Sequence, residues 1–149
     1  MYASSVLESW LEDNCTWMHK ARRGAVSKLV QGLLVGGVAT LSAMGRHIPD
    51  LRREKHGIKC ADRLLGNEHL YAERLKLYQT LGRWLLACLP QPWVVIDWSD
   101  VRPGQRFVML KAAVPVGGRA VTLYEEVHPL KHYGSPGTHL AFLARLKTV

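Results

Sequence analysis

The chain has 149 residues, enough for one domain or two small ones, and its hydrophobic fraction of 48% is that of an ordinary globular core. Lys and Arg (20) outnumber Asp and Glu (12), which makes nucleic acid the leading partner class, with a generic basic surface that serves only solubility as the alternative. An odd cysteine count without any Cys-x-x-Cys pair argues against a disulfide framework or a zinc site and predicts a reducing, cytoplasmic environment.

Two helices are predicted near the start of the chain. Apolar residues recur at helical spacing from Val6 to Met18, and the basic cluster between Lys20 and Arg23 is expected to close this helix at its negative dipole end, before Gly24. The same spacing from Val26 to Leu34 predicts a second helix, with Gly36-Gly37 as its stop signal.

The apolar segment from Leu29 to Met44 does not predict a membrane span. It is shorter than the ~20 residues that a span needs, and polar residues and glycines interrupt it. The chain also opens without the basic region and apolar core of a secretion signal. We therefore expect neither secretion nor a membrane partner.

A pair of short helices follows. Thr40 is placed to cap a helix that runs to about His47, and a second helix is predicted from Lys55 to Leu65, with Gly66-Asn67 as its stop. The pair has the size of a helix-turn-helix, although its connection is longer than the usual turn of about three or four residues.

The second helix of this pair carries a basic face. Lys55, Lys59 and Arg63 lie four residues apart, so they share one side of the helix, which suits a DNA groove. Together with nearby cations and two side chains that could reach base edges, the candidate DNA-binding residues are Arg46, Arg52, Arg53, Lys55, His56, Lys59, Arg63 and Asn67. The alternative is a solvated basic face that contributes only solubility, because helix-turn-helix spacing is a weak signal.

A long helix leads to a change in composition. From Leu70 to Leu89 the apolar positions step by three or four residues, and Pro90-Gln91-Pro92 ends the pattern. β-Branched and aromatic residues become more frequent after the prolines. We therefore predict two domains, residues 1–90 and residues 91–149.

The second domain is predicted to begin with strands. The continuous apolar run from Trp93 to Asp97 indicates a buried strand. Residues 106–116 and 119–127 flank Gly117-Gly118, a pair that a two-residue hairpin turn favours, and residues 140–146 suggest a final helix. The predicted fold class is α+β, with a helical unit before the first three strands of an α/β domain.

Asp97 is the candidate catalytic and metal-binding residue. An apolar strand that ends on a carboxylate holds that charge at the rim of a sheet, and enzymes that use two divalent ions need several such carboxylates. Asp100 lies just past this strand, near Pro103-Gly104, and is expected to be a turn former.

Other acids and histidines of the second domain are expected to be structural or solvated. Glu125 and Glu126 are predicted to be solvated charges at a sheet edge. A metal site of His128, His132 and His139 is not expected, because the prolines and glycine among them oppose the helix that would align the three rings.

Three ordered segments carry a further signal. They are residues 45–49 together with 55–67, residues 95–100 (Val-Ile-Asp-Trp-Ser-Asp), and residues 110–125. Together they resemble the amino-terminal part of bacterial insertion-sequence transposases of the family-four cut-and-paste group, which have an acidic DDE active site. The resemblance implies a helical domain that binds transposon-end DNA through the first segment, followed by a ribonuclease H-like core that binds magnesium and cuts and rejoins strands. Asp97 matches the first catalytic acid.

The resemblance is incomplete at the active site. The second aspartate and the glutamate of the family have no counterpart here, so one acid of three is retained. We expect Mg²⁺ in the complete enzyme only and no strand cleavage by this chain alone, since one carboxylate cannot position two metal ions. Whether the chain is an enzyme is therefore left open.

The leading hypothesis is a truncated transposase, an incomplete ribonuclease H-like protein that binds the terminal repeat of a transposon in double-stranded DNA. The alternative is a stand-alone DNA-binding protein that inhibits, or pairs with, intact transposase. A third reading is a decayed remnant without function.

Overall fold

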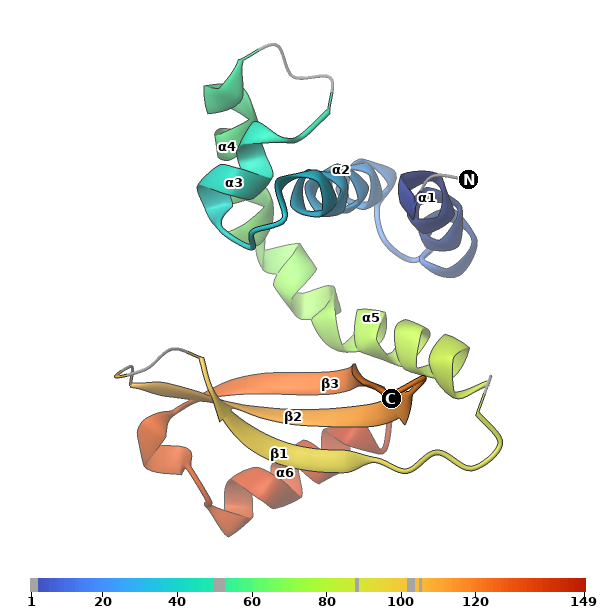
Figure 1. Ribbon diagram of the computed structural model, residues 1–149, viewed down its shortest axis with the longest axis vertical. Helices are drawn as coiled ribbons and strands as arrows, with labels where there is room; N and C mark the ends of the chain where they lie inside the picture. The colour runs from blue at the N-terminus through green and yellow to red at the C-terminus, as the bar shows by residue number, and fades with distance from the viewer. Residues whose placement is uncertain (1–2, 50–52, 88, 102–103, 105) are drawn as a thin grey trace. The chain divides into compact units, whose positions relative to one another are not determined.

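The computed structural model describes residues 3–49, 53–87, 89–101, 104 and 106–149, and these form an α+β protein (Figure 1). In chain order the helices and strands are α1 (Ala3–Asn14), α2 (Lys20–Gly36), α3 (Leu41–Arg46), α4 (Glu54–Leu65), α5 (Glu68–Leu86), β1 (Val95–Asp100), β2 (Phe107–Val116), β3 (Arg119–Pro129), the 3-10 turn η1 (Leu130–His132) and α6 (Pro136–Leu146).

The chain divides into two compact units, here called the helical unit (Met1–Arg74) and the sheet unit (Leu75–Val149). The division falls inside α5, earlier than the proline-rich segment at which composition changes. The reason lies in the packing of α5. Leu70, in its first turn, packs against the core of the helical unit, whereas Leu75 and Tyr78 pack against the core of the sheet unit.

The start of the helical unit differs from the sequence prediction. The first helix ends at Asn14, and the basic cluster from Lys20 to Arg23 opens α2 instead of closing α1. Cys15 and Met18, in the turn between the helices, are almost completely buried. The prediction was wrong because this turn buries apolar residues just as a helix would, so their spacing gave no sign of the reversal.

The end of α2 and both ends of α3 and α4 lie within about one residue of the predicted positions. Gly37 has a left-handed φ of 65° and caps α2, because its N–H donates to the carbonyl of Leu33. The hydroxyl of Thr40 accepts a hydrogen bond of 3.2 Å from the N–H of Ala43 and so caps α3. Gly66 follows the last residue of α4.

Glycines allow α2, α3 and α4 to pack closely. A Cβ atom placed on Gly45 of α3 would lie 2.5 Å from the Cα of Ile58 in α4, closer than such contacts occur in proteins. A small apolar core of this unit consists of Leu29, Ile48, Ala61 and Leu64. The core holds α4 by its apolar side.

The sheet unit contains an antiparallel sheet of order β1-β2-β3. Both residues of the predicted hairpin turn between β2 and β3 have left-handed φ values, 55° at Gly117 and 76° at Gly118, as a tight hairpin requires. One face of the sheet is covered by α6 (Figure 1). Tyr124 and Phe142 lie at the centre of the resulting core, with ring centroids 5.2 Å apart.

The first strand is not buried as predicted. Within the described residues β1 pairs with β2 alone, so it is an edge strand, and Val95 is 60% exposed. Trp93 precedes the strand and is 78% exposed. The apolar run was misleading because residue type alone does not determine whether a further strand pairs beside β1. Asp100, expected in a turn, is the last residue of β1.

Candidate nucleic-acid interface and the strand carboxylate

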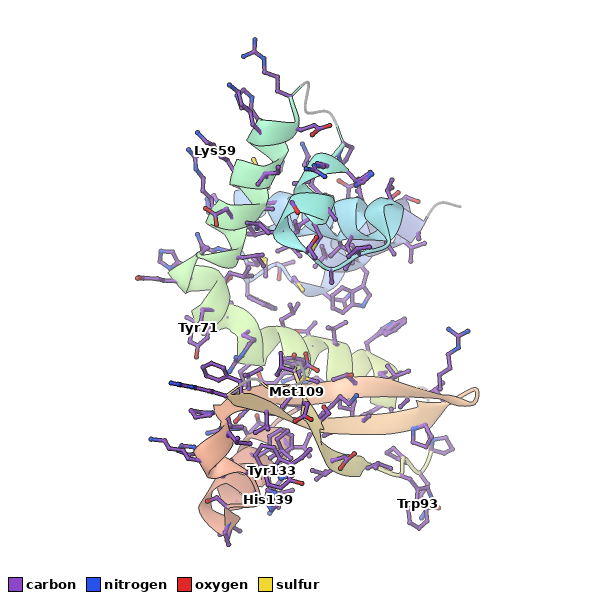
Figure 2. All side chains as sticks on the ribbon, turned by 60° about the vertical axis from the view of Figure 1, so that its left-hand side comes forward. Lys59, Tyr71, Trp93, Met109, Tyr133 and His139 are labelled. Atoms are coloured by element: carbon purple, nitrogen blue, oxygen red, sulfur yellow. The ribbon has the colours of Figure 1, made fainter. Side chains whose placement is uncertain are left out.

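The predicted basic face lies on the exposed side of α4. Lys55, Lys59 and Arg63 are all exposed, while Ala61 and Leu64 on the other side are buried. Figure 2 shows the Lys59 side chain standing out from α4. Among the residues that the structure describes, the three cations have no ion-pair partner, so their charges are available to an external anion.

The other candidate DNA-binding residues differ in whether their side chains already have a partner within the protein. Arg46 lies 3.4 Å from Glu54, an exposed pair that binds weakly. Arg53 immediately precedes α4 and, like His56, is exposed. The side-chain oxygen of Asn67 accepts a hydrogen bond of 2.9 Å from the N–H of Leu70, so Asn67 caps the start of α5. Arg52 lies outside the described residues.

Asp97 lies within β1, exposed, and not at its end. Its carboxylate accepts a hydrogen bond of 2.8 Å from the N–H of Trp98. Across the sheet Asp97 is opposite Lys111, which in turn is opposite Glu125, so an acid, a base and an acid follow one another on one face. Directly opposed charges of this kind stabilise a sheet modestly.

This setting does not fit a two-metal site. Lys111 places a cation between Asp97 and the next carboxylate, Glu125, and the described residues contain no group of three or more His, Cys, Asp or Glu that could hold a metal ion. Several converging carboxylates are needed to neutralise two divalent ions. Asp97 therefore has a lysine, and not a second carboxylate, at the position opposite it in β2.

Glu126 is buried, contrary to the prediction that it is a solvated edge charge. It is 6% exposed, on the sheet face covered by α6, and its carboxylate binds Arg145 and the hydroxyl of Tyr124. Nε2 of His128 lies 3.1 Å from the same carboxylate. The prediction was wrong because adjacent strand residues point to opposite faces, so Glu126 faces the core with Leu110 while Glu125 points the other way.

The charges of this cluster are set by its packing. Burial by itself raises the pKa of Glu126, but hydrogen bonds from Arg145 and Tyr124, together with the charges of Arg145 and His128, hold it below its ordinary value. The hydrogen bond to Glu126 raises the pKa of Arg145. The signal in the sequence is Arg145, the one arginine of α6, three residues after Phe142 and therefore on the same side of the helix.

An aromatic cluster links β1 to α6. Nε1 of Trp98 donates a hydrogen bond of 2.7 Å to Nε2 of His139, and the Trp98 ring lies 5.4 Å from that of Tyr133 and 5.8 Å from that of His128. Figure 2 shows Tyr133 close to His139 of α6. Together with Asp97, Trp98 and His139 line a cavity of about 320 Å³.

Comparison of the chain with known protein families, with curated proteins and with solved structures gave no match. Among the described residues, no helix combines the length and apolar composition that crossing a membrane requires.

Proposed function

We propose that the helical unit binds double-stranded DNA through the basic face of α4, in a protein related to insertion-sequence transposases. The observation that carries the proposal is the arrangement of Lys55, Lys59 and Arg63, exposed on one side of a helix whose other side is held in a core. A rigid helix that presents cations in a row suits the phosphates that border a DNA groove.

The magnitude of the electrostatic contribution can be estimated. Each phosphate neutralised by Lys or Arg lowers the slope of log K against log salt by about 0.9. Contacts from the three cations of the basic face should therefore contribute a slope of about −2.7. Arg46 and Arg53 are exposed beside α4 and could add contacts to the phosphate backbone of DNA.

The first experiment measures binding of a fluorescein-labelled duplex by anisotropy over a range of salt concentrations. We expect Lys59→Gln combined with Arg63→Gln to reduce the magnitude of the salt slope by about two units. The matched control is Lys131→Gln with Lys147→Gln, which removes two exposed cations from the sheet unit. If the first double variant bound DNA with the affinity and slope of the parent protein, the basic face would not be the interface.

The proposed target is the terminal repeat of a transposon, as the resemblance of the three segments implies. Selection of bound duplexes from a random pool tests this part separately. Enrichment of one sequence would support recognition of a defined end, whereas salt-dependent binding without enrichment would contradict it and leave only non-specific affinity.

On the same resemblance, the sheet unit belongs to a ribonuclease H-like core and Asp97 corresponds to the first catalytic acid, with Mg²⁺ supplied by the complete active site. The opposition of Asp97 and Lys111 favours a second candidate, a protein that occupies transposon ends without cutting them and inhibits intact transposase. Co-expression with an intact, related transposase distinguishes the two. Unchanged transposition frequency would rule out the inhibitor.

A further inference from the structure

A pocket of about 580 Å³ opens between α2 and α4 in the helical unit. Its floor is apolar and comes from both helices and the segment after α3, with Leu29, Ile48, Ala61 and Leu64 as its buried members. A volume in this range, lined mainly by apolar side chains with a few polar groups, is typical of sites for small molecules.

The polar residues of this α2–α4 pocket are positively charged or neutral. Lys28 from α2 and Arg63 from α4 line it and are exposed, and none of the described lining residues is an Asp or Glu. Arg22 also lines the pocket, but Glu73 binds it at 2.6 Å and offsets its charge. Lys28 and Arg63 are thus left to attract an anion.

Gly24 is the glycine of α2 that lines the pocket. It lies inside α2, where glycine is less favourable than alanine, and it lines the pocket. A Cβ atom added to Gly24 would meet no other atom within 4 Å. A larger side chain at this position would therefore meet no clash at its Cβ, beside a pocket that Gly24 lines.

We propose that the α2–α4 pocket binds a small amphipathic organic anion, whose apolar body rests on the floor and whose carboxylate meets Lys28 and Arg63. The apolar floor alone would bind hydrophobic molecules of any charge. Lys28 and Arg63, with no Asp or Glu among the described lining residues, favour a ligand that is negatively charged. Charge-assisted hydrogen bonds are stronger than neutral ones, so the carboxylate is the part that fixes the ligand's orientation.

Arg63 belongs to both the pocket and the basic face. A ligand that holds the Arg63 side chain in the pocket withdraws one cation from DNA, so ligand and DNA should weaken each other's binding. This consequence rests on the proposed DNA-binding function, whereas the pocket itself does not.

The test uses 1-naphthoate as the probe and 1-naphthylmethanol as its neutral counterpart, followed by amide NMR shifts of the full chain. We expect saturable shifts at pocket residues with naphthoate and at least about tenfold weaker binding of the alcohol. Arg63→Gln should weaken the binding of naphthoate to a similar extent. Lys59→Gln, which removes a cation of the same helix outside the pocket, is the matched control and should leave the affinity for naphthoate unchanged.

Gly24→Leu provides an independent check of the location, because it should fill the pocket and abolish the shifts while the protein stays folded. Unchanged naphthoate affinity in Gly24→Leu or Arg63→Gln, or equal affinity for the alcohol, would overturn the proposed site. The same samples test the coupling by anisotropy with labelled DNA. If naphthoate binds but the DNA affinity is unchanged, the competition for Arg63 is refuted and the proposed pocket site still stands. If the chain does not bind DNA even without naphthoate, the proposed DNA-binding function is wrong and the pocket proposal is unaffected.

Discussion

Glu126 of β3 and Arg145 of α6 are joined by two hydrogen bonds, one from Nε and one of 2.7 Å from Nη2 to Oε2. The pair is asymmetric, since the Glu126 side chain is 7% exposed and that of Arg145 is 42% exposed. The buried carboxylate has lost its hydrogen bonds to water, and its partners in the protein replace them. The guanidinium is still in contact with water. This contact connects the last strand of the sheet to the helix that covers it.

Replacing Glu126 by Gln should destabilise the sheet unit by about 2 kcal/mol. Breaking a buried charge pair costs about 3–5 kcal/mol, but the exposure of Arg145 reduces the penalty because water can solvate the remaining guanidinium. Urea unfolding followed by NMR signals of β2 and β3 measures the loss. Glu125→Gln, at the neighbouring, half-exposed position, is the control and should change stability by less than about 0.5 kcal/mol.

The stability of the sheet unit should fall with acid through Glu126. Its pKa in the folded protein is lower than the ordinary value of 4.5, so its contribution to stability is complete above about pH 4.5 and is lost as the pH falls through the folded pKa. Urea midpoints between pH 7 and pH 3 should therefore decline less in Glu126→Gln than in the parent chain. Parallel declines in both proteins would assign acid sensitivity to other groups.

Gly45→Ala should destabilise the helical unit by about 2 kcal/mol, because overpacking of a tight contact costs about 1–3 kcal/mol. The added methyl group would meet backbone atoms of Ile58 at 2.5 and 2.7 Å, and backbone cannot yield as a flexible side chain can. Gly24→Ala is the matched helical control, and its Cβ has open space. Thermal unfolding should show a lower midpoint for Gly45→Ala and an equal or higher one for Gly24→Ala, which gains about 0.5–1 kcal/mol of helix propensity.

Asp97→Asn should alter stability by less than about 1 kcal/mol, because an exposed strand charge opposite Lys111 contributes modestly. We also expect no magnesium-dependent nicking of supercoiled plasmid by the purified chain, since Lys111 separates the carboxylates on that face of the sheet. Gel electrophoresis of the plasmid measures nicking. Activity that requires Mg²⁺ and disappears in Asp97→Asn would contradict this view of the site.

The sequence by itself determined the end of α2, the bounds of α3 and α4, and the turn of the hairpin. Thr40, Gly37 and Gly117-Gly118 act through their own backbone or that of residues a few positions away, so their effects can be predicted from local rules. The basic face of α4 was equally predictable, because residues four apart on a helix share a side whatever the helix packs against.

The tertiary structure alone decided where charges and strands are buried. Glu126 is buried because α6 brings Arg145, 19 residues away in the sequence, to its carboxylate. The exposure of β1 depends on its place at the sheet edge, and the reversal after Asn14 depends on the burial of Cys15. Burial results from contacts between distant segments, and no local pattern of residues specifies which of those segments meet.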